Sequence, residues 1–355
     1  RHNALHMKDV IIVGAGQAGL SMSYYLSKQN KDFLVLDANE QIGAPWLKRW
    51  DSLKLFTPTE YNHLPGMQFP KEKGYYPNKY EVAEYLASYV EQFNIPVEFN
   101  QKVISVVKEA GHFNVQTETE SYQAKRVIVA TGPFHTPYTP DCHRQLDDQI
   151  LQIHSEHYKS PEQLQDGESL VVGAGDSGVQ ILQEIAETGR KVYFSGTDKI
   201  TSIPQTLLGK TLWWWFSKIG FLTVSKYTWI GNYLSKGVQP VIGTDVKALL
   251  ARDNVEHVGR TQSADKLNIE FEKKNINSIK NIVWATGFKP NFNWIDGVSL
   301  DDRGYPKNYR GVSKDHVGLY FIGLPWLYTR GSATLGGVYK DANYLANEIA
   351  SCEQN

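Results

Sequence analysis

Residues 9–20, DVIIVGAGQAGL, decide the fold of this chain. An apolar run, Val10–Val13, leads into the spacing Gly-x-Gly-x-x-Gly and then into a helical pattern that continues to Leu26. A second apolar run, Phe33–Leu36, ends in Asp37, 18 residues after Gly19. Strand, glycine turn, helix, strand and acid in this order predict a dinucleotide-binding unit. The glycines permit a tight turn, the helix N-terminus can bind a pyrophosphate, and the acid can bind ribose hydroxyls.

The same arrangement occurs a second time. The apolar run Ser169–Val172 precedes Gly173-Ala174-Gly175-Asp176-Ser177-Gly178, a helical pattern over 179–188 and a further apolar run, Val192–Ser195. Further along the chain, each unit is followed by an apolar run that ends in Ala-Thr-Gly, at 130–132 and at 285–287. Because one dinucleotide needs one such unit, the repetition predicts two bound dinucleotides.

The order of these patterns predicts an α/β fold with two doubly wound, Rossmann-like domains. Alternating stretches, at 97–107 with 113–117 and at 267–271, predict small antiparallel meanders. We expect an FAD-binding domain at 7–145, an NAD(P)-binding domain at 146–281 with an aromatic insertion at 207–235, and the remainder of the FAD domain at 282–355. The last strand, 319–323, and the last helix, 339–350, are expected to complete the first domain.

Composition excludes several classes of protein. The 355 residues carry a net charge of -1, so no overall field attracts nucleic acid. The two cysteines, Cys142 and Cys352, are too far apart in sequence for a CxxC redox pair or a zinc motif, and no metal site is expected. No run of about 18 apolar residues predicts a membrane span. Residues 1–6 show no leader pattern and are set aside from the fold, so a reducing, cytoplasmic location is expected.

Further motifs carry a resemblance to a known family. They are Trp46, Arg49-Trp50-Asp51-Ser52-Leu53, Leu55-Phe56-Thr57-Pro58, Leu64-Pro65-Gly66, Phe69-Pro70, Tyr76-Pro77, Trp284-Ala285-Thr286-Gly287-Phe288, Gly323-Leu324-Pro325-Trp326 and Arg330-Gly331-Ser332-Ala333. Together with the paired glycine turns and the paired Ala-Thr-Gly segments, they make residues 9–349 similar to the flavin-dependent monooxygenases. Within that group the chain most resembles the compact bacterial members related to plant YUCCA-type and animal flavin-containing enzymes.

The resemblance implies an FAD site and a nicotinamide site. The residues implied for the FAD ADP moiety are Gly14, Gly16, Gln17, Ala18, Gly19, Asp37 and Ala38. Trp46, Arg49 and Thr57 would line the isoalloxazine, and Val103 would contact adenine through its backbone. Ala130, Thr131 and Gly132 would close over FAD, while Gly323 and Leu335 would face the flavin. The residues implied for the nicotinamide dinucleotide are Gly173, Gly175, Asp176, Ser177, Gly178, Ala285, Thr286 and Gly287.

The coenzyme preference is expected to be relaxed between NADPH and NADH. Family members that require NADPH carry an arginine just after the second strand of the nicotinamide domain. This chain has Ser195, Thr197 and Lys199 as phosphate contacts there, with Asp198 opposing them and no guanidinium.

By resemblance, the function is an FAD-dependent NAD(P)H monooxygenase that uses a flavin hydroperoxide and oxygen to oxygenate a small lipophilic nucleophile or ketone. The family fingerprint departs here at Asp148 and Ile150, although His154 and Tyr158 match it. Two alternatives remain open: a flavin reductase or oxidase that passes electrons to a quinone or oxygen, and a flavin-bearing redox accessory protein.

No catalytic residue is assigned, because the chemistry belongs to the flavin. The flavin-adjacent candidates are Asp51 and Phe56, the latter standing where animal enzymes have an asparagine. A simple salt bridge between Arg49 and Asp51 is the alternative interpretation of that pair.

The run Leu212-Trp213-Trp214-Trp215-Phe216 is the most unusual segment. It could pack in the core, cover a lipophilic substrate, or contact a membrane surface or a protein partner through Trp213, Trp214 and Trp215. The oligomeric state is not predicted.

Overall fold

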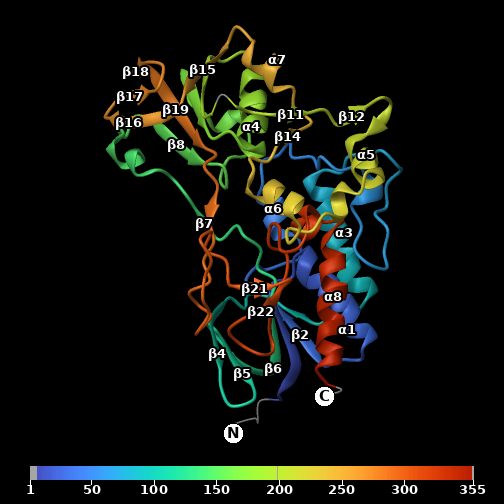
Figure 1. Ribbon diagram of the computed structural model, residues 1–355. Coiled ribbons are helices and arrows are strands. Elements are labelled where there is room, and N and C mark those ends of the chain that lie inside the picture. The colour runs from blue at the N-terminus through green and yellow to red at the C-terminus, as the bar shows by residue number, and fades with distance from the viewer. Residues whose placement is uncertain (1–5, 198, 354–355) are drawn as a thin grey trace.

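Two sheets, each with its own glycine turn, dominate the computed structural model (Figure 1). The structure describes residues 6–197 and 199–353. Residues 1–5, which were set aside from the fold, and Asp198, which was expected to oppose a phosphate, lie outside the described residues. Both sheets have a parallel core, which confirms the expected fold of two doubly wound units.

The first sheet places β1 at its centre. Its order is β21-β22-β23-β6-β1-β2-β3, and β4 and β5 pair beside β6. The strands are β1 (Lys8–Val13), β2 (Phe33–Leu36), β3 (Val97–Glu98), β4 (Val103–Lys108), β5 (Phe113–Thr117), β6 (Ser121–Val129), β21 (Asn308–Tyr309), β22 (Val312–Ser313) and β23 (Leu319–Phe321). Because β23 pairs in parallel with β6, the C-terminal part of the chain completes the first sheet, as expected.

Alternation along β1 divides the core of this unit into two layers. Val10 and Ile12 are buried against helices, whereas Ile11 and Val13 are buried on the side of β4 and β5. The helices are α1 (Gln17–Lys28), α2 (Ala44–Leu47), α3 (Lys79–Gln92) and α8 (Val338–Ser351). Figure 1 shows α1, α3 and α8 together beside this sheet, where Leu20 and Leu345 share one apolar cluster.

The second sheet is parallel throughout, in the order β15-β10-β9-β19-β8. Its elements are β8 (Leu151–His154), β9 (Glu168–Val172), α4 (Asp176–Glu187), β10 (Val192–Ser195), α7 (Val246–Leu250), β15 (Val255–Gly259) and β19 (Ile279–Trp284). Next to it lies an antiparallel meander of β16 (Thr261–Asp265), β17 (Asn268–Phe271) and β18 (Asn275–Ile276).

Two details differ from the sequence expectations. Val97 belongs to β3, which extends the main sheet in parallel beside β2, so the first meander begins only at Val103. Strand β19 remains paired in the second sheet through Trp284, because β8 and β9 hold it on both sides. The change of sheet therefore falls after Trp284 and not between residues 281 and 282, while the rest of the domain division stays a prediction.

The two crossings between the units run side by side. β7 (Thr136–Pro137) follows the first Ala-Thr-Gly segment and pairs antiparallel with β20 (Phe288–Lys289), which follows the second. This ribbon lies between the two sheets in Figure 1. The two Ala-Thr-Gly ends are thus brought to the same place.

The aromatic insertion folds as a separate lobe over the boundary of the two units. Its elements are β11 (Ser202–Ile203), β12 (Thr206–Leu207), β13 (Lys210–Thr211), α5 (Leu212–Lys218), α6 (Trp229–Lys236) and β14 (Val241–Ile242). β12 and β13 form a hairpin, and β14 returns to pair with β11. In Figure 1, α5 and α6 lie between the upper sheet and the helices of the lower unit.

Candidate functional site

The first glycine turn has the shape of a pyrophosphate cradle. Gly14 leaves β1 with a φ of 106°, and a Cβ there would lie 2.6 Å from the Ala130 carbonyl oxygen. A Cβ on Gly19 would lie 1.9 Å from the Gly14 carbonyl oxygen, so the helix packs directly on the turn. Gly16, by contrast, has no atom within 4 Å of an added Cβ. It caps α1, whose free N–H groups face this open space and suit a bound anion.

Asp37 lies beside this turn at the end of β2. One carboxylate oxygen accepts the Ala15 N–H at 2.7 Å, and the other accepts the backbone and side-chain N–H groups of Asn39. The Gln101 N–H donates to the Asp37 carbonyl at 2.8 Å and so brings the start of β4, at Val103, to the same edge. Ala38 is exposed next to Asp37. The geometry fits an acid that holds ribose hydroxyls.

Segments from distant parts of the chain close this first site. The hydroxyl of Thr131, in the first Ala-Thr-Gly segment, is buried and has no hydrogen-bond partner. A Cβ on Gly323 would lie 2.8 Å from Cβ of Ala18, and the Gln17 amide contacts the Ala333 carbonyl at 3.5 Å. Leu335 is buried just before α8. An unsatisfied hydroxyl beside an open glycine turn fits the expected FAD.

The flavin segment at 46–62 is held by a buried amide that the sequence reasoning missed. Asn62 is 1% exposed, and its amide donates to the Thr57 carbonyl at 2.6 Å while the Thr57 hydroxyl donates to its oxygen. Asn62 lies just after the matched motif, six residues beyond Phe56, the position where animal enzymes have an asparagine. Because the hydrogen bonds of Asn62 are used locally, it serves to position Thr57. Trp46 is half-buried against the helical cluster of the same unit.

The second glycine turn repeats the first. Gly173 has a φ of 125°, and an added Cβ would lie 2.0 Å from the Ala285 carbonyl oxygen. A Cβ on Gly178 would lie 2.0 Å from the Gly173 carbonyl oxygen, whereas one on Gly175 would have no atom within 4 Å. Asp176 and Ser177 begin α4, and Asp176 accepts the Ile242 N–H at 3.3 Å. Burial raises the pKa of Asp176.

A basic cavity of about 280 Å³ adjoins this second turn. It lies where β10 and β15 end and is lined by Thr197, Lys199, His257, Gly259, Arg260, Glu272 and Lys273. His257 donates through Nε2 to the Gly196 carbonyl, while Lys273 Nζ lies 3.0 Å from its Nδ1. Three cations and one carboxylate therefore surround a space large enough for a phosphate.

This cavity corrects the expectations for phosphate contacts. Ser195 is 1% exposed and its hydroxyl is hydrogen bonded to Thr261, so its side chain does not line the cavity. The sequence shows no guanidinium after β10, but Arg260, which follows the neighbouring strand, lines this cavity. The parallel pairing of Ser195 with Gly259 brings it there. Sequence reasoning missed Arg260 because that pairing is a tertiary contact.

Arg49 lies where the two units meet. Its guanidinium carbon is 5.2 Å from the ring centre of Phe134 and 5.8 Å from that of Phe288, the aromatic residues that follow the two Ala-Thr-Gly segments. Burial lowers the Arg49 pKa, and no carboxylate in residues 6–197 and 199–353 forms an ion pair with it. A partly desolvated cation between the two cofactor sites suits an anionic or electron-rich ligand.

Asp51 does not pair with Arg49. Its carboxylate lies 3.4 Å from the buried Nζ of Lys79, which also donates to the Leu47 and Arg49 carbonyls. The Asp51 N–H donates to the Lys159 carbonyl in the linker. The simple Arg49–Asp51 salt bridge is therefore wrong, and Asp51 helps to hold the Arg49 loop against the linker.

The two matching fingerprint residues also hold segments in place. His154 is 9% exposed, donates through Nε2 to the Gly287 carbonyl at 3.0 Å and accepts the Glu156 N–H at Nδ1. Burial lowers the pKa of the His154 imidazole. The Tyr158 hydroxyl donates to Glu184 on α4 at 2.9 Å. Thr286 donates from its hydroxyl to the Tyr138 carbonyl, so the second Ala-Thr-Gly segment is fixed from several sides.

The aromatic insertion contacts both units. Trp213 is 5% exposed, its ring stacks on Phe56 with centroids 5.9 Å apart, and its indole N–H donates to the Phe56 carbonyl at 3.1 Å. At the other end of the lobe, Ile242 contacts Asp176 as described. Of the three alternatives for this run, Trp213 follows packing and is not available for an outward contact, whereas Trp214 and Trp215 are half-buried.

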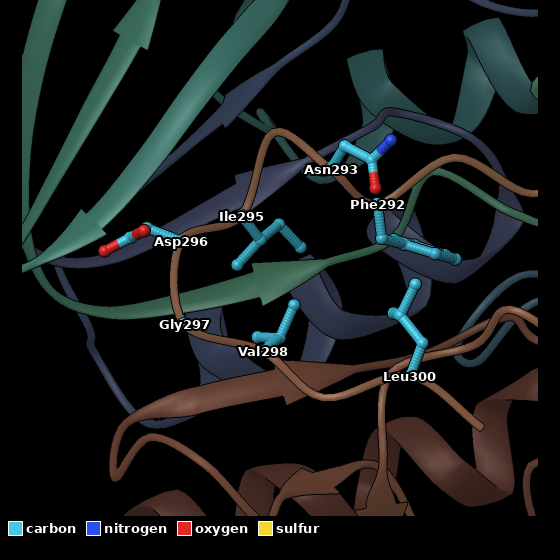
Figure 2. Close-up of a pocket in the computed structure, with 7 residues that line it drawn as sticks. All are labelled: Phe292, Asn293, Ile295, Asp296, Gly297, Val298 and Leu300. Atoms are coloured by element: carbon cyan, nitrogen blue, oxygen red, sulfur yellow. The ribbon is translucent and has the colours of Figure 1, made fainter.

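A second cavity of about 280 Å³ takes no part in this site. Figure 2 shows Ile295, Val298 and Leu300 pointing toward one another within the 292–300 loop. None of its lining residues belongs to a glycine turn or to an Ala-Thr-Gly segment. In the part of the chain that the structure describes, no group of His, Cys, Asp and Glu residues is arranged to hold a metal.

Comparisons with known proteins place this geometry among oxidoreductases. The family model described as pyridine nucleotide-disulphide oxidoreductase matches residues 11–208. An uncharacterized oxidoreductase named CzcO-like, from Geobacillus kaustophilus, is 43% identical over 345 residues, which cover 97% of this chain and 99% of the relative. An Arabidopsis thaliana protein named probable indole-3-pyruvate monooxygenase YUCCA8 is 28% identical, over 97% of this chain and 89% of its own length.

Solved structures agree with the fold. A flavin-containing monooxygenase from Stenotrophomonas maltophilia superposes with a TM-score of 0.82 at 24% identity, covering 97% of this chain and 98% of that one. These findings confirm the flavin monooxygenase resemblance, the oxidoreductase class and the expected cofactor classes, FAD and a pyridine nucleotide. No described helix is both long and apolar enough to cross a bilayer.

Proposed function

We propose that this chain, which belongs to the pyridine nucleotide-disulphide oxidoreductase family, is an FAD-dependent monooxygenase driven by NADPH. One observation carries the proposal: the two Ala-Thr-Gly ends meet at Arg49, between Phe134 and Phe288. Two dinucleotides seated on the two glycine turns would therefore have their reactive ends in a shared space.

The residues of the chain supply binding and positioning. The open spaces at Gly16 and Gly175 would take the two pyrophosphates, and Asp37 the ribose of FAD. When bound, FAD accepts a hydride from the nicotinamide and passes electrons to oxygen. Arg49 would hold negative charge between the cofactors, while His154 and Thr286 keep the second Ala-Thr-Gly segment in register.

The substrate class follows from the apolar residues where the insertion meets the flavin segment. Phe56, Tyr61 and Trp213 belong to one apolar cluster that joins the flavin segment to the insertion. Phe56 serves as a flat apolar wall, and Asp51 as a positioning residue for the Arg49 loop. Such a lining favours a small lipophilic nucleophile or ketone, and it excludes water from the reacting groups.

NADPH is the coenzyme that the cavity beside Gly175 favours. Arg260 and Lys273 add to Lys199 the cations that suit a 2′-phosphate, and neither of the two entered the sequence argument for a relaxed preference. A thiol-based mechanism is disfavoured, because Cys142 and Cys352 are both free and burial raises the pKa of the Cys142 thiol. A cytoplasmic location stays a prediction.

Isotope labelling tests the proposal. The FAD-loaded protein would be supplied with NADPH, ¹⁸O₂ and a panel of small thioethers and cyclic ketones. A monooxygenase places one labelled oxygen in the product for each NADPH consumed. Peroxide formation equal to NADPH consumption with every substrate would favour the oxidase alternative. NADPH oxidation that needs an added quinone would favour the reductase, and binding of FAD without any NADPH consumption would favour an accessory protein.

A further inference from the structure

Helix α6 presents an apolar face that the proposed reaction does not use. Trp229 is 82% exposed and Tyr233, one helical turn later, is 77% exposed, with Ile230 exposed beside them. Val238, just beyond the helix, is 84% exposed. Side chains four residues apart share one face of a helix, so Trp229 and Tyr233 form a continuous aromatic strip.

The opposite face of α6 is fixed to the body of the protein. Gly231 is buried, and a Cβ there would lie 1.9 Å from the Ser225 carbonyl oxygen. The Thr228 hydroxyl caps the helix by accepting the Gly231 N–H, and the Lys226 N–H donates to the Tyr328 carbonyl. Gly231 lies about 200° around the helix from Trp229. The aromatic strip is thus held outward by the packing of the helix, rather than exposed by fraying.

The charge of the lobe is as unusual as its apolar surface. Between Asp198 and Asp245 the sequence contains five lysines and no acidic residue, whereas the rest of the chain holds 32 basic and 38 acidic residues. Lys218 and Lys236, at the ends of α5 and α6, are both exposed. Exposed Trp and Tyr beside lysines, without acids, match the chemistry of an anionic lipid surface.

We propose that the lobe at 207–238 docks this protein on an anionic membrane surface, with Trp229 and Tyr233 inserted at the level of the lipid headgroups. The occupant is lipid because a lysine-only charge pattern repels a second copy of the same surface. The contact does not depend on the identity of the oxidised substrate.

Vesicle co-sedimentation of the full FAD-loaded chain tests this proposal. We expect binding to vesicles with about 30% phosphatidylglycerol, little binding to pure phosphatidylcholine, and release at about 0.5 M salt. The double variant Trp229→Ala/Tyr233→Ala should lower the partition coefficient at least about tenfold. Tyr80→Ala, which removes an aromatic residue that is 54% exposed on α3, is the matched control and should bind like the wild type.

Charge variants separate the electrostatic part. Lys218→Gln/Lys236→Gln should weaken binding about 30-fold, at about 1 kcal/mol for each lysine near the surface. The control variant Lys73→Gln/Lys314→Gln removes the same charge from exposed positions outside the lobe and should not weaken binding. The proposal is overturned by absence of vesicle binding, by equal binding to neutral vesicles, or by a Trp229→Ala/Tyr233→Ala variant that only converts an oligomer to a monomer. NADPH oxidation in vesicle-free buffer should be unchanged in the Trp229→Ala/Tyr233→Ala variant. The vesicle test is therefore independent of the proposed reaction.

Discussion

Replacing Gly175 with alanine should weaken nicotinamide binding at least about tenfold without unfolding the chain. Gly175 caps α4 with a φ of -80°, which alanine adopts freely, and an added Cβ meets no atom within 4 Å. Alanine gains about 0.4–1 kcal/mol through the unfolded state and loses a similar amount as a poorer N-cap residue. The net change in unfolding free energy is therefore within about 1 kcal/mol.

The effect on binding is much larger. The methyl group would occupy the space in which the pyrophosphate meets the helix N-terminus, and each charge-assisted hydrogen bond lost there costs about 1.5–3 kcal/mol. The KM for NADPH should rise at least about tenfold for each hydrogen bond lost, with FAD content and melting temperature near those of the wild type.

Two glycine variants serve as controls for this reasoning. Gly16→Ala should reduce FAD content instead, because it is the matching open position in the first unit. Gly173→Ala should destabilise the chain, since its Cβ would lie 2.0 Å from the Ala285 carbonyl oxygen. A Gly175→Ala protein with wild-type KM for NADPH, or one that melts more than about 10 °C lower, would refute the assignment of this space to a pyrophosphate.

Three further predictions concern the cavity, the buried acid and the lobe. Arg260→Gln should raise the KM for NADPH about 10- to 100-fold and leave that for NADH unchanged, because one charge-assisted contact to the 2′-phosphate is lost; equal effects on both coenzymes in steady-state assays would contradict the cavity assignment. Asp341 is 2% exposed and burial raises its pKa from 3.8 to about 6, so its charge destabilises the folded state above pH 6 and not below pH 3.8. Asp341→Asn should accordingly stabilise the protein by up to about 3 kcal/mol at pH 8 and much less near pH 4, as measured by urea unfolding, whereas the same change at both pH values would argue against the raised pKa. Trp213→Ala should increase the peroxide released per NADPH because the wall over Phe56 is opened, while Trp214→Ala, at a half-buried position, should change it little; equal peroxide yields would show that the lobe does not seal the site.

The glycine turns show why much of this architecture is predictable from sequence. Close packing at Gly14, Gly19, Gly173 and Gly178 excludes every side chain, so each position requires glycine and leaves a readable pattern. Local patterns likewise predict these elements: β1 and β9 are short apolar runs buried on both faces, and α4 has the helical period of a buried apolar face. The apolar run at 319–323 near the C-terminus likewise predicts a last strand for the first sheet, and β23 pairs there in parallel with β6.

The parts that sequence reasoning missed depend on tertiary contacts. Arg260 reaches the basic cavity only because β15 pairs with β10, and nothing in its local sequence marks it. The sequence leaves the orientation of Trp213, Trp214 and Trp215 open, because adjacent aromatic residues do not reveal which of them packs against a residue such as Phe56. Trp229 and Tyr233 carry the clearer local signal, a spacing of one helical turn beside lysines.

Each glycine turn packs directly against the backbone of its Ala-Thr-Gly segment, so the turn and the strand end cannot move independently. No side chain separates Gly14 from Ala130 or Gly173 from Ala285, so a displacement of either turn would also displace the strand end on which it packs. A few residues further on, both strand ends carry the rings that flank Arg49. Each glycine turn is thus linked to the Arg49 contact through a short length of closely packed backbone.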